Sequence, residues 1–531
     1  MCRPPLWLAS LPCTRRRQLG WRAEGDGYSN RAVQREGELA GCVVGAVRPG
    51  AEQRVPQPVQ TTLHPERSSE KHACLHQNRR SRPSQQRGAA ARGCRRRGMS
   101  YATTHGDEQS SAIVLDVGSN STKAGFAGED SPQHVFSSAV GTWMDDGGSS
   151  KIYGVNRREL WHSRHREQLP FELEYPIVQG QVGDWDCLER VWEHALRNQL
   201  GIRDGEADRH PILAVDANFS SRQQREGTAE RLFESFGAPA VYLAKSAVCS
   251  CVAASKSTGL VLEVGGGIST CTPVLDGTVM HKGVVKSALA GDFLTDVLAQ
   301  KMLAKHSVLP AHSFRALKRD LRGLPKVEEI HSAASPAAYG SYMQRMTFQG
   351  IKETLCQINE RQITKDTKIP GLSARLPDGK EIELQRERFV VPEMLLTGVS
   401  DKRLRGSIAT SENHCHDLLT LPELLIASVS TIEDEEEQKK FYTNVVVCGG
   451  SSLFPKLDNR LRGFIEAQWN LPTGKRIISS PSAPMQPTYY QKWSAWLGGS
   501  IMASFSSFMP MWVSKHEYDE HGVNYVLKRS G

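Results

Sequence analysis

Two glycine-rich turns carry the residues of this chain that could do chemistry. The first, Asp116–Lys123, follows the apolar run 112–115, and the second, Glu263–Thr270, follows the apolar run 260–262. Each turn is predicted to end a buried strand, where a β-hairpin could reverse. Such turns present backbone N–H groups to phosphate oxygens, because glycine has no Cβ to hold the anion away and nearby hydroxyls add donors. The pair therefore predicts a clamp for a nucleotide.

A third glycine turn, Gly449–Pro455, follows the apolar run 444–448 and precedes a predicted helix. Between the turns, strands expected at 211–215 and 241–243 alternate with amphipathic helices. The helices are expected at 185–200 (behind Asp184 as N-cap), 221–236 and 246–254. This alternation predicts an α/β protein on mixed sheets, with two halves whose strand ends surround one ligand.

Positive charge is confined to the N-terminal segment. Residues 1–98 hold 19 basic and 7 acidic residues, a net charge of +12, whereas residues 99–531 hold 47 and 51, a net charge of −4. The segment has no helical or strand period, so we expect a disordered basic extension. It could contact nucleic acid or act as an import signal. The favoured alternative is that translation begins at Met99 and that residues 1–98 are absent in the cell.

The cysteines and the hydropathy exclude several classes of protein. No cysteine spacing resembles a metal site, and Cys249 and Cys251 lie in an apolar helical stretch, which predicts buried thiols in a reducing compartment. The sequence has no convincing signal peptide and no apolar run of 18 residues. We therefore expect a soluble intracellular protein that does not bind membranes.

The ordered motifs resemble the actin superfamily from about Ser111 to the C-terminus. Residues 116–130 resemble its first phosphate loop, residues 263–277 its second and residues 449–455 its adenosine motif, with further matches at 175–177, 351–353 and 496–504. The resemblance implies an α/β, actin-like two-lobed fold over residues 99–531, with paired RNase H-like domains around a nucleotide cleft.

The resemblance also implies ATP, with Mg²⁺, as the ligand. The residues that match phosphate contacts are Asp116 (also an indirect Mg²⁺ contact), Gly118, Ser119, Lys123, Gly265, Gly266, Gly267 and Ser269. Those that match nucleoside and adenine contacts are Lys352, Glu353, Gly449, Gly450, Leu453, Phe454 and Lys492. Phe454 can stack where a tyrosine is common. The alternative for each glycine turn is a retained structural turn that binds nothing.

The groups that hydrolyse ATP in this superfamily are incomplete, so no residue is predicted to be catalytic. Asp116 remains, but Glu263 stands where an aspartate is usual, Gly266 replaces a second aspartate, and Ser246 replaces a glutamine. Phosphoryl transfer depends on positioned water and charge. The resemblance therefore implies ATP binding with negligible turnover.

Within the superfamily, the chain resembles the nuclear actin-related proteins of chromatin-modifying complexes. Residues 285–293, 376–379 and 388–393 resemble that class, and the stretch 141–153 is short and polar where actin has a longer loop that grips the next subunit. This implies a non-enzymatic nuclear assembly subunit of chromatin remodelling and histone acetyltransferase complexes. Actin, a long helix of a remodeller or scaffold subunit, and histones are the implied partners. The alternatives are a filament-forming cytoskeletal actin-like ATPase and, disfavoured by the run 496–501, a sugar kinase or chaperone ATPase.

Two further segments bear on partners. Six apolar residues near the C-terminus predict a groove for an amphipathic helix: Trp496, Ile501, Met502, Phe505, Phe508 and Met511. The alternative is that these residues are buried in the core, above all Trp496 and Ile501. The acidic run 433–437 is interpreted as a solvated loop or helix start rather than a histone-binding patch.

Overall fold

The computed structural model describes residues 111–145, 148–153, 171–203, 209–309, 314–319, 325–329, 337–364, 367–376, 379–400, 418–472, 477–479 and 487–531. The predicted extension 1–98 and the proposed start at Met99 lie outside these residues.

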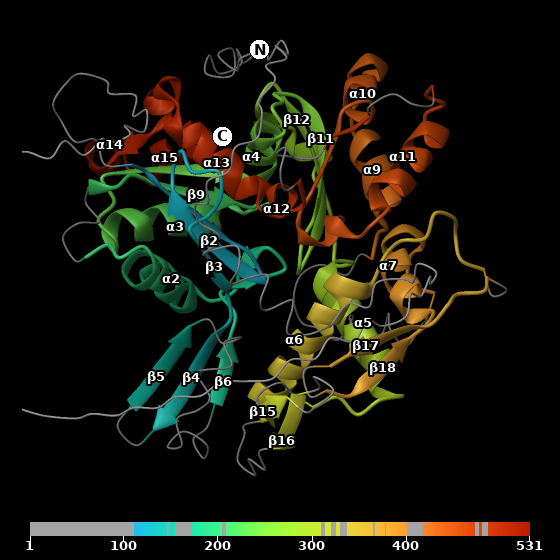
Figure 1. The fold of residues 1–531 in the computed structure, drawn as a ribbon. Coiled ribbons are helices and arrows are strands. Elements are labelled where there is room, and N and C mark those ends of the chain that lie inside the picture. The colour runs from blue at the N-terminus through green and yellow to red at the C-terminus, as the bar shows by residue number, and fades with distance from the viewer. Residues whose placement is uncertain are drawn as a thin grey trace, which may run out of the picture. The chain divides into compact units, whose positions relative to one another are not determined.

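A six-stranded mixed sheet organises the first part of the described chain (Figure 1). Its strands lie in the order β21 (Val513–Ser514), β10 (Ala240–Lys245), β9 (Ile212–Asp216), β1 (Ile113–Val117), β2 (Ser121–Phe126) and β3 (His134–Ser137). Strands β10, β9 and β1 are parallel, whereas β1, β2 and β3 form an antiparallel meander. Helices α2 (Trp185–Glu193) and α3 (Arg222–Glu234) share a core with one face of this sheet. The predicted N-cap Asp184 is confirmed, and Ser221 caps α3 in the same way, since both side chains accept bonds from backbone N–H groups of the first turns.

A second mixed sheet repeats this plan. Its order is β13 (Thr278–Val279), β12 (Ser269–Leu275), β11 (Gly259–Val264), β19 (Val445–Cys448) and β20 (Ile478–Ser479), and β14 (Val285–Ser287) pairs with β12. The β11–β12 hairpin is antiparallel, and β11, β19 and β20 are parallel. In both sheets, therefore, a glycine turn closes the first hairpin, and the strands predicted around these turns are confirmed.

Besides the core of each sheet, one hydrophobic cluster contains residues from both sheets. Val114 and Leu213 from the first sheet and Val261 and Val446 from the second belong to it, together with residues of α4 (Ser246–Ala253) and α13 (Ser494–Ser504). The backbones of α4 and α13 touch, because a Cβ on Gly498 would lie 1.8 Å from the carbonyl oxygen of Cys249.

The predicted burial of the Cys249 and Cys251 thiols on α4 is confirmed, and burial raises the pKa of both.

The remaining helices lie mostly in the second part of the chain (Figure 1). They are α5 (Gly291–Leu303), α6 (Ala337–Leu355), α7 (Glu387–Thr397), α9 (Leu421–Val429), α10 (Glu435–Tyr442), α11 (Leu457–Gln468), α12 (Pro487–Lys492), α14 (Lys515–His521) and α15 (Val523–Arg529). Short 3₁₀ turns span His281–Gly283, Gly450–Leu453 and Ser506–Met511. The other strands are β7 (Ile177–Val178), β8 (Gln181–Val182), β15 (Phe314–Arg319), β16 (Pro325–Glu329), β17 (Leu372–Arg375) and β18 (Glu381–Leu384).

In three segments the structure refines the prediction made from the sequence. The helix expected over 185–200 is α-helical to Glu193 and continues as a π-helical segment, His194–Gln199. The stretch 141–153 is not a loop, because its described residues form the hairpin of β4 (Val140–Asp145) and β5 (Gly148–Tyr153), which pairs with β6 (Phe171–Glu174). The acidic run is a helix start, since Asp434 caps α10 by accepting bonds from two backbone N–H groups.

A polar network stabilises the β4–β5–β6 sheet. Lys151 Nζ donates to Thr142 Oγ1 and to both Glu174 carboxylate oxygens, at 2.7, 2.6 and 2.7 Å. These cross-strand bonds explain why a polar stretch forms strands. Among the helices described here, none combines the length and apolar character needed to cross a membrane.

Candidate nucleotide site

The two predicted phosphate turns face each other. Residues 118–120 close the β1–β2 hairpin, and residues 265–268 close the β11–β12 hairpin. A Cβ placed on Gly267 would lie 2.7 Å from Ser119 Oγ and 2.9 Å from Ser119 Cβ, closer than real side chains approach. Around Gly266, the nearest such distance is 3.0 Å, to Asn120 Cβ. Glycine therefore fits at positions 266 and 267, where the second turn meets the first.

Two of the predicted glycines shape their own turns. Gly118 donates its N–H to the carbonyl oxygen of Ser121 at 3.1 Å, and Gly265 donates to that of Ile268 at 3.0 Å. These bonds tie each turn at its base. They leave the tips of the two turns, residues 119–120 and 266–267, opposite each other.

Asp116 and Lys123 form an ion pair beside the first turn. They lie directly opposite each other on β1 and β2, with Lys123 Nζ 3.1 Å from Asp116 Oδ2. Their side chains are only 15% and 12% exposed. A Cβ on Gly118 would lie 3.6 Å from Lys123 Nζ, which places the ammonium group against the phosphate turn. Lys123 can thus supply a fixed positive charge to an anion held there.

Glu263 and Ser246 are joined by a hydrogen bond at the end of β11. Ser246 Oγ donates to Glu263 Oε2 at 3.0 Å. Burial and the nearby Asp116 carboxylate raise the pKa of Glu263, against the opposing effects of the Ser246 bond and the Lys123 charge. The hydroxyl at position 246 is therefore bonded to a carboxylate.

The two predicted nucleoside contacts on α6, Lys352 and Glu353, are both hydrogen-bonded to other residues. Lys352 on α6 is buried and donates to the Gly291 carbonyl oxygen at 2.7 Å and to Thr295 Oγ1 at 2.8 Å. Burial lowers the pKa of Lys352. Glu353 accepts a 2.8 Å bond from Gln349 Nε2. The Lys352 ammonium group therefore binds the first turn of α5, whereas the Glu353 carboxylate binds a residue of its own helix.

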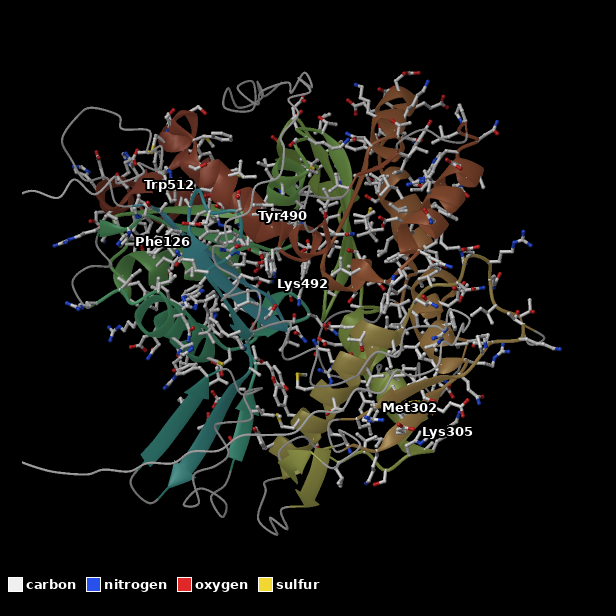
Figure 2. All side chains as sticks on the ribbon, viewed as in Figure 1. Phe126, Met302, Lys305, Tyr490, Lys492 and Trp512 are labelled. Carbon is white, nitrogen blue, oxygen red and sulfur yellow. The ribbon has the colours of Figure 1, made fainter. Side chains whose placement is uncertain are left out.

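The third glycine turn packs on the second. Gly449 has φ of 91°, and a Cβ on it would lie 2.5 Å from the Val264 carbonyl oxygen, so only glycine fits there. Ser451 Oγ donates to the Gly265 carbonyl oxygen at 2.9 Å. A Cβ on Gly450 would meet Lys492 Cγ at 3.8 Å, an ordinary contact. Lys492 is the last residue of α12, where Figure 2 labels it. The structure therefore brings the three glycine turns together at one place.

Of three further predicted contacts, two are buried. Ser269 is fully buried and its Oγ donates to the Leu289 carbonyl oxygen at 2.8 Å, so this hydroxyl is used inside the protein. Phe454 is 7% exposed and belongs to the core of the second sheet. Leu453, which ends the 3₁₀ turn, is partly exposed.

No group of three or more potential metal ligands occurs among the residues that the structure describes. Asp116, the predicted indirect Mg²⁺ contact, is the partner of Lys123.

The predicted apolar groove is partly core. Trp496, Met502 and Phe508 are buried, and Trp496 Nε1 donates to the Val114 carbonyl oxygen at 3.0 Å. The core alternative is therefore the right one for these three. The other candidates remain partly exposed beside the 52% exposed Met509: Ile501, Phe505 and Met511.

Sequence reasoning did not assign Gly291, Ser451 or Asn120 to the site, although all three lie among the turns. Gly291 donates its N–H to the Gly265 carbonyl oxygen at 3.0 Å, and a Cβ on it would lie 2.3 Å from Ser451 Oγ. Asn120 contacts residues of α5 and α6 from the first turn. The sequence held a signal for each, because Asn120 lies in the first glycine turn, Ser451 in the third, and Gly291 in the stretch 285–293.

Comparison with known proteins identifies the class of protein. A family model described as Actin matches residues 107–530. The chain therefore belongs to the actin family, and the predicted α/β, actin-like fold is confirmed.

Within the family, the chain is an actin-related protein similar to actin-related protein 4. Actin-related protein 4 of Arabidopsis thaliana is 31% identical over 455 residues, which cover 80% of this chain and 99% of the plant protein. The protein of the same name from Oryza sativa subsp. indica is 32% identical over 453 residues, with the same coverage. That of Schizosaccharomyces pombe is 29% identical over 435 residues, or 79% of this chain and 96% of the yeast protein.

Proposed function

We propose that this protein binds ATP without hydrolysing it and serves as a nuclear assembly subunit of chromatin remodelling and histone acetyltransferase complexes. The observation that carries the nucleotide part is the meeting of the turns at 118–120, 265–268 and 449–453, with glycine where their backbones touch. Similarity to proteins named actin-related protein 4 supports the assembly role.

The residues present fit an adenine nucleotide. Gly266 and Gly267, at the tip of the second turn, would let backbone N–H groups approach phosphate oxygens, and the Lys123 ammonium, which pairs with Asp116, lies beside the first turn. Mg²⁺ bound to the phosphates would neutralise further charge, with Asp116 as the nearby carboxylate. Gly450, Leu453 and Lys492 are proposed to contact the adenine.

The same site is poorly built for hydrolysis. Gly266 has no side chain to orient a water molecule, and the Ser246 hydroxyl donates to Glu263 instead. Because phosphoryl transfer relies on positioned groups, we expect bound ATP to persist and to stabilise the folded chain by linkage.

A partner helix is proposed to dock on the partly exposed residues Ile501, Phe505 and Met511. An amphipathic helix buries such residues in a groove. The proposed partners are actin, a helical segment of a remodeller or scaffold subunit, and histones.

The nucleotide proposal is tested on the full chain purified from nuclei. Extracted nucleotide is expected to be ATP, and a single-turnover assay is expected to show no cleavage above the solution background. Empty protein, or cleavage at the rate of filament actin measured in parallel, would refute the proposal. Pelleting with ATP and Mg²⁺ would favour the filament-forming alternative.

The assembly proposal is tested by affinity purification of the wild type and two variants. A remodeller ATPase and actin are expected with the wild type and to be lost with Phe505→Asp. Leu303→Asp, which changes an apolar side chain 42% exposed on α5, is the matched control and should retain both. Equal recovery with all three proteins would refute the proposed groove.

A further inference from the structure

Asn120 reaches from the first phosphate turn to two helices of the second sheet. Its Nδ2 donates to Gln349 Oε1 on α6 at 3.2 Å and lies 3.4 Å from Asp292 Oδ1 on α5. Gln349 Nε2 also lies 3.4 Å from Asn120 Oδ1. Because the partners are 172 and 229 positions away in the sequence, these bonds hold only while the first turn and the two helices stay together.

Both partners of Asn120 are anchored to the candidate nucleotide site. The backbone N–H of Asp292 donates to the Gly266 carbonyl oxygen in the second phosphate turn at 2.8 Å. Gln349 also donates to the predicted nucleoside contact Glu353 at 2.8 Å. Asn120 therefore joins one phosphate turn to the other and to the nucleoside side of the site.

Arg345 balances the negative charge of Asp292 beside Asn120. Arg345 Nη2 lies 3.4 Å from Asp292 Oδ1, and Arg345 Nε donates to Asp296 Oδ1 at 2.6 Å. The guanidinium group thus fixes the carboxylate that Asn120 approaches.

The amide chemistry suits a contact beside phosphates. An amide offers both a donor and an acceptor, so Asn120 and Gln349 can bond reciprocally. Neither side chain carries a charge that would repel a triphosphate, as a carboxylate at position 120 would.

We infer that Asn120, Gln349 and Asp292 form a latch between the two phosphate turns that must open before nucleotide leaves. This inference rests on the proposed binding of ATP. Opening exchanges partly buried hydrogen bonds for bonds to water, so the latch slows release.

Release of a fluorescent ATP analogue from the full chain, chased with excess ATP, tests the latch. Asn120→Ala and Gln349→Ala are each expected to release it roughly three- to ten-fold faster than wild type, the range for losing one hydrogen bond. The double variant should be no more than about two-fold faster than the faster single variant, because both substitutions break the same contact. Asn359→Ala and Gln385→Ala, which change exposed amides bonded to local neighbours, are the controls and should match wild type.

The outcomes separate the latch from the proposed function. If wild type retains no analogue, ATP binding fails and the latch with it. If wild type retains it and both single variants release it at the wild-type rate, only the latch is overturned. Rates that multiply in the double variant would also overturn it, since independent contacts with the nucleotide would give that result. Gln349→Ala lies on a partly exposed helix face and provides a test even if the turn variant folds poorly.

Discussion

Replacing Gly267 with alanine should push the two phosphate turns apart. The new Cβ would lie 2.7 Å from Ser119 Oγ and 2.9 Å from Ser119 Cβ. Because nonbonded heavy atoms pack at about 3.5 Å, relief needs a movement of roughly 0.8 Å. Overpacking of this kind costs about 1–3 kcal/mol. If the whole cost falls on the ATP-bound form, the dissociation constant rises about 5- to 150-fold.

The assay is titration of the full chain with ATP, accompanied by denaturation without nucleotide. Ser119→Gly removes both atoms that the new methyl group meets, whereas the next atom, Gln179 N, is an ordinary 3.5 Å away. The double variant Gly267→Ala/Ser119→Gly should therefore bind ATP no worse than Ser119→Gly alone. Gly463→Ala on α11, where a Cβ meets nothing within 4 Å, is the control. Wild-type affinity and stability in Gly267→Ala, or additive losses in the double variant, would show that the turns do not touch.

Two further predictions concern single groups of the site. Gly450→Ala should weaken ATP binding, because the new methyl group would occupy space proposed for the nucleotide. Its denaturation midpoint should stay at the wild-type value, because the Cβ makes only an ordinary contact with Lys492. Unchanged affinity would place adenine elsewhere. Glu263 has a folded-state pKa raised above 4.5 by burial and Asp116, so its contribution to stability is full below pH 4.5 and is lost as pH rises through the folded value. Nucleotide-free Glu263→Gln should accordingly be more stable than wild type at pH 7.5 and lose this advantage below pH 4.5, and lower stability at pH 7.5 would contradict the raised pKa.

The local parts of the fold could be predicted from the sequence. Apolar runs that end in glycine turns predicted the β1–β2 and β11–β12 hairpins, and a carboxylate before an amphipathic stretch predicted the cap at Asp184. Each of these features depends on neighbours within a few residues. The matching family motifs then ordered them into one fold.

Contacts between distant segments could not be predicted in the same way. The bonds of Asn120 to Gln349 and of Ser451 to Gly265 join positions 229 and 186 apart, and no local period encodes them. Ser269 was expected to face the ligand, but as the first residue of β12 its hydroxyl meets the Leu289 carbonyl oxygen. An apolar run likewise does not say whether it covers a core or a partner, as the burial of Trp496 illustrates.

The glycines of the site differ in what their presence implies. At Gly449 and Gly265 a Cβ would collide with backbone, at 2.5 Å from Val264 O and 2.8 Å from Ile268 O, so packing alone requires glycine even if the chain binds nothing. Gly450 and Gly118 are under no such demand, since a Cβ on them meets its nearest atom at 3.8 and 3.4 Å. A Cβ could be accommodated at both positions. Packing alone therefore does not require glycine at these two positions, and this agrees with the proposed anion site beside Lys123.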